Sequence, residues 1–453
     1  MRTSLAAPLA LLATAAAAAA GMPAFPGAEG FGAASAGGRG GKAILVSNLN
    51  PSGPGSLQAA CDAQGPRIVV FRVSGVIRGN VAIRHPRITI AGQTAPGAGI
   101  TIEGMLVNPY RIQPNLHDVT IRFLRVRPPA RKGKWAGGDC LQLTDIDRLI
   151  IDHVSCSWGS DENMDLCNSR QISVQWSAIE QSDTRGHTKG PHNYGMILGY
   201  AGRDATIHHN LFAHHARRAP LCGLELLDHR NNVIYNMGAP LNWHPTRMNQ
   251  QRPGQPFRAN IIANTFKAGP NARRDGRTAT LDRIMSSRSA VHAYTSGNVL
   301  TWLGKVAEDR GEPRADQPWP APPVATQEAG AAYRLVLAHA GCLPRDAVSL
   351  RTLREVRDST GQWGRHEPLD GLMEGLEPDE PPPDADADGM PDAWEKAHRL
   401  DPTDPADAIR IVPKGASKED RHAGYTWIEF YINALADRLI AQAMAEPPDK
   451  ATQ

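Results

Sequence analysis

Short runs of β-branched residues recur between about residue 66 and residue 300, and this repeat restricts the possible folds more than any other feature of the chain. Each run leads into Asn, His, Gly or Ser. Clear examples are "ITIAGQT", "VTIRFLRV", "LIIDHVSCSW", "ISVQWSAIE" and "ATIHHNLFAHH", which begin at Ile88, Val119, Leu149, Ile172 and Ala205. Repeats of roughly 20 to 50 residues without long helices between the strands are typical of solenoids. The pattern therefore predicts an all-β fold, a parallel β-helix.

The competing all-β fold is a β-sandwich, but its strands would recur about every 8 to 12 residues and would be joined by hairpin turns. With 453 residues and 41% hydrophobic content, the chain is long enough to bury a core of its own. Its formal net charge is only +3 and it has no long basic run. Nucleic acid is therefore not expected as a partner, and any acidic ligand must be recognised locally.

The N-terminal stretch "MRTSLAAPLALLATAAAAAAG" combines a basic residue, an apolar run and small residues near Ala20. This predicts a secretory signal peptide over residues 1–21 and a secreted protein, extracellular or periplasmic. A membrane anchor is the alternative, but the run is short and alanine-rich for a bilayer span, so no membrane association is expected. In an oxidising compartment the six cysteines can pair, although the sequence does not say how; they are Cys61, Cys140, Cys156, Cys167, Cys222 and Cys342. For Cys140, Cys156 and Cys167 the alternative, left open, is that they are small buried residues in successive turns.

The composition changes after residue 330. Residues 331–381 are predicted to form short helices and a Pro-rich linker, and residues 382–445 a small helical module. Within that module "DADADGMPDAWE" matches the EF-hand calcium loop, with Gly389 at its sharp turn. An acidic disordered linker is the alternative, although the apolar helix that follows could pack on the loop. The predicted calcium ligands are Asp384, Asp386, Asp388, Met390 through its carbonyl, Asp392 and Glu395.

Several dissimilar motifs occur in one order between about residue 24 and residue 300. They are "AFPGAEGFGAASAGGRGG", "VSNLNPSGPGSLQAA", "RIVVFRVSGVI", "ITIAGQTAPGAGI", "IIDHVSCSWGSDE" and "HHNLFAHHARRAP". Together they resemble the bacterial pectate lyases of polysaccharide lyase family 1, and the tail resembles segments often appended to such enzymes. The resemblance implies a right-handed parallel β-helix, here residues 22–330. It also implies cleavage of pectate (polygalacturonate) by calcium-assisted β-elimination, which yields 4,5-unsaturated oligogalacturonides.

Elimination from a uronate removes the C5 proton, which is acidic only when charge on the neighbouring carboxylate is neutralised. A hard divalent cation held by carboxylates meets that need. Asp139 and the pair Asp161 and Asp165 lie one repeat apart, so a solenoid can place them on one face. The resemblance gives these three aspartates the role of calcium ligands, and Glu162 can substitute if the register shifts by one residue. The alternative is a solvated acidic turn.

The same resemblance assigns substrate binding to Lys189 and proton abstraction to Arg218. The family motif carries a second arginine where this chain has Gly223, and Arg217 is one replacement to consider. Arginine acts as a base only if calcium, Lys189 and desolvation lower its pKa, so an alkaline optimum is expected. Hydroxide or Lys189 sharing the proton transfer is the alternative, and the residues do not decide between them.

Histidines suggest a rival base or a transition-metal site, but no HxH or HExxH spacing is present. The histidines concerned are His153, His187, His192, His208, His209, His214 and His215. Most are expected to stabilise solenoid turns, and His187 is the one to test for a catalytic role. Two other functions stay open, a noncatalytic β-helical polysaccharide-binding protein and a β-helical glycoside hydrolase using a carboxylate pair. A monomer is expected.

Overall fold

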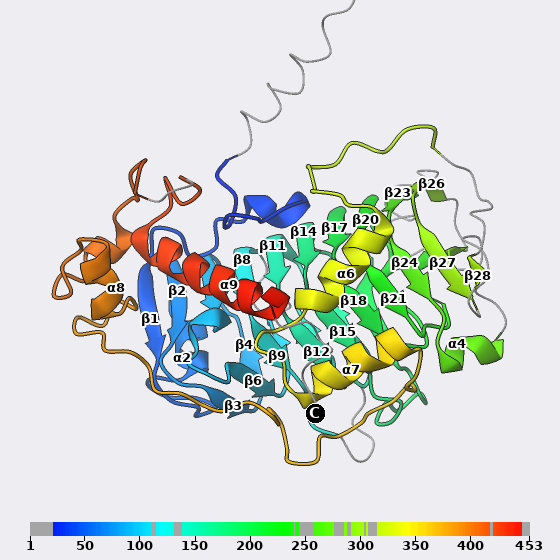
Figure 1. The fold of residues 1–453 in the computed structure, drawn as a ribbon, viewed down its shortest axis with the longest axis horizontal. Coiled ribbons are helices and arrows are strands. Elements are labelled where there is room, and N and C mark those ends of the chain that lie inside the picture. Colours follow the sequence, from blue (N-terminus) through cyan, green and yellow to red (C-terminus); the bar gives the residue numbers. More distant parts are fainter. Residues whose placement is uncertain are drawn as a thin grey trace, which may run out of the picture.

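The computed structural model describes residues 21–109, 115–130, 138–200, 202–239, 241–243, 257–275, 285–287, 291–302, 305–306, 315–416 and 420–445. The predicted signal peptide, apart from Gly21, lies outside these residues. Within them the chain winds through three sheets of parallel strands, and most strands pair with the strand three positions further along the sequence; the exceptions are the β1–β2 pair and the antiparallel β27–β28 pair. Figure 1 shows the successive strands stacked from β1 at one end to β28 at the other. This is the predicted parallel β-helix, and the prediction is confirmed.

The three sheets are named A, B and C. Sheet A contains β1 (Lys42–Val46), β2 (Arg67–Phe71), β5 (Ile88–Ala91), β8 (Leu116–Arg122), β11 (Ile146–Asp152), β14 (Arg170–Gln175), β17 (Asp204–His208), β20 (Leu226–Arg230), β23 (Phe257–Ile262) and β26 (Val291–Ser296). Sheet B contains β3 (Gly75–Arg78), β6 (Ile100–Glu103), β9 (Leu124–Val126), β12 (Ser155–Ser157), β15 (Ala178–Glu180), β18 (Leu211–Ala213), β21 (Val233–Tyr235), β24 (Thr265–Lys267), β27 (Val299–Trp302) and β28 (Lys305–Val306). Sheet C contains β4 (Val81–Ala82), β7 (Leu106–Val107), β10 (Leu141–Gln142), β13 (Glu162–Asp165), β16 (Tyr194–Leu198), β19 (Leu221–Cys222), β22 (Leu241–Trp243) and β25 (Met285–Ser287).

The sequence repeat sets the register of sheet A. The first residues of the quoted runs pair with one another from coil to coil, and each is fully buried in the same core: Ile88, Val119, Leu149, Ile172 and Ala205. Burying one aliphatic side chain of this size stabilises a fold by roughly 1.5 to 3 kcal/mol, so a slip by one residue would be costly across every coil. The hydrophobic pattern therefore determines how the coils stack.

Polar side chains stack at the turns between sheets A and B. The backbone N–H groups of Asn210, Asn232 and Asn264 each donate to the side-chain oxygen of the next asparagine in the series, which ends at Asn298. Beside this ladder the rings of Trp176 and His209 stack with centroids 4.1 Å apart. These contacts satisfy backbone groups that the turns leave unpaired. They confirm the structural role expected for the turn histidines.

All six cysteines are buried and free, and the structure contains no bond between them. Burial raises the pKa of the Cys61 thiol to about 12, so it stays protonated and inert. Of the two possibilities left open by the sequence, small buried residues are what the fold contains. None of the helices in the described residues has the length and apolar character needed to cross a bilayer.

Several helices cover the solenoid, and two short ones, η2 (Gly92–Thr94) and α4 (Pro270–Asp275), lie in the turns between its strands. The others in the described residues are η1 (Phe31–Ala34), α2 (Leu57–Asp62), α6 (Ala329–His339), α7 (Ala347–Asp358), α8 (Asp392–Ala397), η3 (Asp407–Ile409) and α9 (Trp427–Ala445). Helices α6 and α7 cover sheet B, where Val336 and Val356 join a cluster with Leu211 and Val233. Figure 1 shows both helices in yellow across the strands of this sheet.

The C-terminal segment packs on the first coils. Ile68 and Val70 of β2 share an apolar cluster with Met390 of the acidic loop and with Ile428 and Ile432 of α9. The side chain of Gln93 also donates to the carbonyl of Ile432. The helical tail is therefore present and seated on sheet A. That residues 382–445 fold as an independent unit stays a prediction.

Candidate active site

Three neighbouring strands of sheet C position the acidic residues. In the paired strands β10, β13 and β16, Asp165 is level with Gln142 on one side and Ile197 on the other, and Glu162 is level with Tyr194. Between the acidic residues Met164 points into the core, where it is fully buried. Asp165, the next residue of β13, points to the opposite face and lines the cavity outside the core.

Three carboxylates meet where β13 begins. Oxygen atoms of Asp139, Asp161 and Glu162 lie within 4.8 Å of one another. Asp139 accepts hydrogen bonds from the backbone N–H of Glu162 at 3.0 Å and from the side chain of Gln142 at 3.3 Å. The structure thus brings together two of the three predicted calcium ligands, Asp139 and Asp161. The third carboxylate in the group is Glu162, the residue named as a substitute.

Asp165 stands apart from this group. Its Oδ1 accepts a hydrogen bond from the backbone N–H of Cys167 at 2.9 Å, and it belongs to none of the carboxylate groups within the described residues. Burial raises the pKa of Asp165, and the nearby charge of Asp161 adds to the effect. Asp165 still lines the same cavity as Asp161 and Glu162. It can face a ligand in that cavity without sharing the position where the other three carboxylates meet.

Arg218 faces the carboxylates from the coil of β19, two strands away from β13 in sheet C. Its backbone has a positive φ of 72°, a conformation that costs a non-glycine residue of order 1 kcal/mol. Two backbone hydrogen bonds hold it there, one from its N–H to Ala239 and one from the N–H of Met196 to its carbonyl. Its guanidinium forms an ion pair with Glu162, and its central carbon lies 3.9 Å from the centre of the Tyr194 ring. The guanidinium is therefore held by a carboxylate and by an aromatic ring.

Burial lowers the pKa of Arg218 to about 10, although the charges of Asp161 and Asp139 act in the opposite direction. The ordinary value lies above 12, so the shift brings the neutral guanidine within reach of alkaline conditions. The direction agrees with the predicted role as a base. Sequence reasoning missed Tyr194, whose ring supports the guanidinium; it stands in "GPHNYG", where nothing in the spacing marks it.

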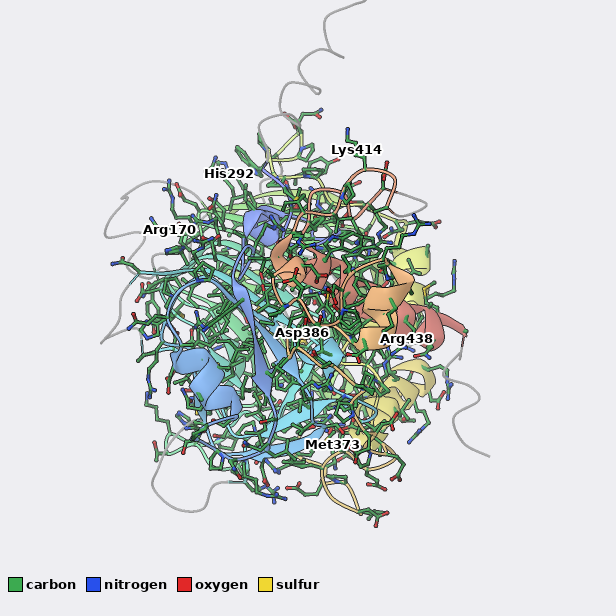
Figure 2. The ribbon with its side chains drawn as sticks, turned by 90° about the vertical axis from the view of Figure 1, so that its left-hand side faces the viewer. Arg170, His292, Met373, Asp386, Lys414 and Arg438 are labelled. Atoms are coloured by element: carbon green, nitrogen blue, oxygen red, sulfur yellow. The ribbon has the colours of Figure 1, made fainter. Side chains whose placement is uncertain are left out.

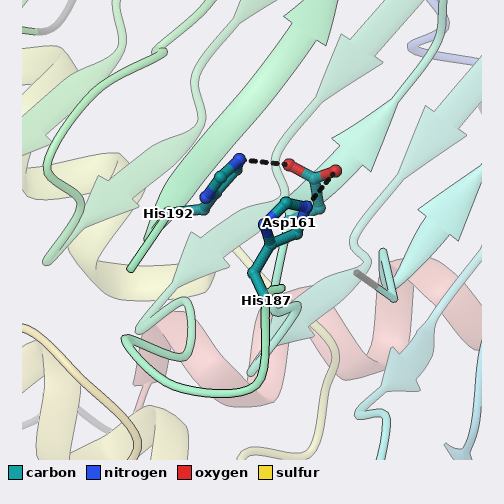
Figure 3. A group of neighbouring side chains, drawn as sticks. All are labelled: Asp161, His187 and His192. Atoms are coloured by element: carbon teal, nitrogen blue, oxygen red, sulfur yellow. Dashed lines mark ion pairs between the residues drawn. The ribbon is translucent and has the colours of Figure 1, made fainter. Parts of the chain in front are cut away.

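Two histidines contact Asp161. His187 Nε2 lies 3.4 Å from Asp161 Oδ2, and His192 Nε2 lies 3.7 Å from Asp161 Oδ1 (Figure 3). The backbone N–H of Lys189 donates to His187 Nδ1 at 3.1 Å, so a neutral His187 carries its proton on Nε2 and donates toward Asp161. Burial lowers the pKa of His187, which favours that neutral form. His187 therefore lies against the Asp161 carboxylate, and ligand atoms of Asp161, His187 and His192 lie within 4.8 Å of one another, so these three side chains could also hold a metal ion.

The other histidines that were considered are buried in the solenoid wall: His153, His208, His209, His214 and His215. His214 contacts Glu355 of α7 at 3.0 Å, and His215 contacts the carbonyl of Ile179 at 2.8 Å. Burial lowers the pKa of His215 to about 3, so it stays neutral. The structural role predicted for this set is confirmed.

A cavity of about 350 Å³ joins the site residues. Its lining includes Asp161, Glu162, Asp165, Lys189, Tyr200 and Arg218. Lys189 is exposed at the rim, where its ammonium can meet an anionic ligand. Arg217 and Gly223 are not among the lining residues, so the cavity itself offers no replacement for the second arginine of the motif. A cavity with carboxylates on one wall and cations on another suits an anionic sugar that is bridged by a metal ion.

The acidic loop of the tail gathers a second set of carboxylates. Oxygens of Asp384, Asp386 and Asp388 lie within 4.8 Å of one another, and Asp388 also belongs to a group with Glu395 and Asp407. Asp407, in η3, was missed by the sequence reasoning because it lies beyond the loop; the acidic stretch "DPTDPADA" was the available signal. Burial and the neighbouring carboxylates raise the pKa of Glu395 to about 8. Asp392 is in neither group, and its carboxylate accepts from the N–H of Ala385.

Comparison with known proteins places these features in a family context. No family model matches the chain. A curated protein named "Probable pectate lyase C" from Neosartorya fischeri is 33% identical over 419 residues, which is 88% of this chain and 90% of that protein. A protein of the same name from Aspergillus fumigatus is 32% identical with the same coverage. Both relatives are fungal, so the closer likeness to bacterial enzymes stays a prediction.

Among solved structures, a pectate lyase from Bacillus sp. N165, in complex with trigalacturonate, aligns with a TM-score of 0.50 and 16% sequence identity. The alignment covers 69% of this chain and 98% of that one. At this level of identity the likeness concerns the fold alone. It supports the parallel β-helix seen in the three sheets.

Proposed function

We propose that this protein, which belongs to the pectate lyase family, cleaves pectate by calcium-dependent β-elimination to 4,5-unsaturated oligogalacturonides. The observation that carries the proposal is the placement of Arg218 against Glu162, beside Asp139 and Asp161, in a cavity of about 350 Å³. A base, a cation-binding group and space for a uronate lie together. Elimination from a uronate requires all three.

The carboxylate group suits calcium. Its donors are oxygens only, they converge from two coils of sheet C, and hard cations prefer such ligands. Asp139, Asp161 and Glu162 would hold the ion, and Asp165 would face it from the cavity wall. When bound, calcium supplies charge neutralisation at the uronate carboxylate, which makes the C5 proton more acidic.

Arg218 takes the C5 proton in this scheme. The electron pair of the C5–H bond forms the double bond between C4 and C5, the C4–O bond breaks, and the leaving oxygen takes a proton from water. Tyr194 keeps the guanidinium in place through ring contact. A cation held by Asp161 and Glu162 would replace Arg218 as their counter-charge and so disfavour its protonated form. Lys189 would bind a substrate carboxylate at the rim.

Three further proposals rest on the sequence. The N-terminal pattern supports secretion to the periplasm or medium, and the enzyme is proposed to act as a monomer on acidic polysaccharide. The tail loop is proposed to bind a second calcium ion through Asp384, Asp386, Asp388 and Glu395, together with the carbonyl of Met390; Asp392 was also predicted.

Product chemistry tests the function. The enzyme is incubated with polygalacturonate and with highly methylated pectin, each in calcium and in chelator, and near-ultraviolet absorbance and reducing ends are both followed. A lyase that prefers pectate gives both signals together on polygalacturonate, and only in calcium. Reducing ends without absorbance would show a hydrolase. Binding of the polymer with neither signal would show a noncatalytic binding protein.

A further inference from the structure

The tail contains buried carboxylate oxygens that no group of the protein satisfies. Glu395 is fully buried and neither of its side-chain oxygens has a hydrogen-bond partner. Two further carboxylates of the same group each have one oxygen without a partner. They belong to Asp388, which is 5% exposed, and to Asp407, which is fully buried. Leaving buried anions unpaired is costly, so such a group is stable only when a cation or protons occupy it.

Asp407 comes from a segment beyond the loop. Its Oδ2 accepts a hydrogen bond from the backbone N–H of Asp401 at 3.0 Å, and that bond aims Oδ1 at Glu395 and Asp388. Asp392, the loop residue expected to serve as a ligand, behaves differently. It starts α8 and its Oδ1 holds the N–H of Ala385 at 2.8 Å. The group is thus closed by a residue outside the twelve-residue loop.

The loop also rests directly on the solenoid. Gly389 has a φ of 95°, and a Cβ atom there would lie 3.1 Å from Val70 and 3.3 Å from Ala43, so the loop approaches β1 and β2 closely and a side chain at this position would be crowded. Arg72, just after β2, lies 3.7 Å from Asp384 and donates to the carbonyl of Pro382. Figure 2 shows Asp386 at this end of the molecule, facing the viewer.

We propose that Asp384, Asp386, Asp388, Glu395 and Asp407 form one closed calcium site that fastens the tail to the first two strands of the solenoid. Asp407 is a ligand from outside the loop, and the ion joins the loop, α8 and η3 on the outer face of β1 and β2. The proposal deepens the calcium loop put forward above and is independent of lyase activity. Its consequence is a calcium requirement for stability, separate from the requirement for turnover.

Calcium titrations of thermal unfolding test the ligand set. All proteins carry Asp161→Asn to weaken the ion in the active site, and calcium is added after chelation. We expect Tm to rise by roughly 4 °C when calcium is about 100-fold above its dissociation constant. Asp407→Asn keeps the acceptor for Asp401 but loses the charge, so it should need at least about tenfold more calcium. In chelator it should be no less stable than its parent, because one repulsive charge is gone.

Asp392→Asn is the matched control, since asparagine keeps the acceptor for Ala385 and removes the same charge. It should shift the calcium midpoint less than about twofold. An Asp392→Asn shift as large as that of Asp407→Asn would overturn the assignment of Asp407 in favour of an ordinary EF-hand loop. A Tm of the Asp161→Asn parent that does not change with calcium would overturn the proposed tail site altogether. This conclusion would hold whatever the lyase assay shows on the natural enzyme.

Hydrogen exchange on the full chain tests the fastening. In calcium, the backbone amides of β1, Lys42–Val46, and of α8 should exchange slowly, and in chelator both should exchange faster. At low calcium, the exchange rates of Asp407→Asn should match those of the chelated protein. Strand β17, Asp204–His208, lies further along the solenoid and should not respond. Protection that changes in the loop but not in β1 would contradict the fastening role.

Discussion

Arg218 forms an ion pair with Glu162, which is only 5% exposed. The pair joins the proposed base to the carboxylate group that would hold calcium. Because both groups are largely removed from water, we expect the charge of Glu162 to favour protonated Arg218, in the same direction as the charges of Asp161 and Asp139. A cation bound to Glu162 would neutralise the charge that favours protonated Arg218 and would therefore lower the pKa of Arg218. Through this ion pair, metal binding would make Arg218 a more available base.

The first prediction concerns this pair. Glu162→Gln removes the anion that favours protonated Arg218, so the pKa of Arg218 should fall and the alkaline rise of kcat should move to lower pH. The plateau itself should fall by about tenfold or more, since a calcium ligand and an orienting contact are both lost. The pH dependence of kcat in saturating calcium measures both effects. A lower plateau with an unmoved rise would show that Glu162 does not set the pKa.

The second prediction ranks the calcium ligands. Asp139→Asn and Asp161→Asn should each raise the calcium concentration for half-maximal activity by about tenfold or more, because each removes an anion from the converging group. Asp165→Asn should raise it less, since its carboxylate is engaged with the N–H of Cys167. Calcium activation curves on polygalacturonate give the order. Asp147→Asn, on β11 and paired with Arg148, is the control and should leave the curve in place.

Sequence reasoning predicted the solenoid because stacked parallel strands leave a direct trace in hydrophobic spacing. The runs beginning at Ile88 and Val119 pair residue for residue as that spacing requires. The ligand set of the candidate site was harder to predict from the sequence. The sequence spacing left Asp161 as the predicted ligand and Glu162 as a substitute one residue away, and the structure places oxygen atoms of both within 4.8 Å of Asp139.

Contacts between distant segments left no such trace. Tyr194 supports Arg218 from a neighbouring coil, and Asp407 meets Glu395 from beyond the loop, because tertiary packing and not local spacing brings them together. The packing of the tail on β2 could not be predicted either. An apolar helix must bury its hydrophobic face, but its sequence does not identify the surface against which that face packs.

The third prediction concerns the anchoring of α7. Asp346 caps this helix through the N–H of Ser349 and forms a buried ion pair with Arg127. Asp346→Asn keeps the cap but leaves Arg127 without its anion, so it should destabilise the protein by about 3 to 5 kcal/mol at neutral pH. Chemical unfolding measures the loss. Asp358→Asn, at the exposed end of the same helix, is the control and should leave the unfolding midpoint nearly unchanged.

The same carboxylate predicts an acid transition. The arginine pair outweighs burial and lowers the pKa of Asp346 to about 2, against about 3.9 in an unfolded chain. A lowered folded-state pKa contributes stability that is complete above about pH 4 and is lost as the pH falls toward 2, about 2.5 kcal/mol in all. The stability difference between the natural protein and Asp346→Asn should shrink over that window. A difference that stays constant from pH 5 to pH 2 would contradict this account.

Turnover by Arg218→Lys, measured against pH on folded protein, tests the central claim most directly. In saturating calcium the natural enzyme should form ultraviolet-absorbing product at a rate that rises about tenfold per pH unit and levels off below about pH 10, because the bound cation lowers the pKa of Arg218 further from the value of about 10 that it has without the ion. Arg218→Lys keeps a positive charge but loses the planar group and moves the nitrogen, so turnover should collapse at every pH while polygalacturonate binding and Tm are retained. His187→Ala should keep measurable turnover with the same alkaline rise. Near-normal cleavage by folded Arg218→Lys, or an inactive His187→Ala beside an active Arg218 variant, would contradict the account and move the base to histidine.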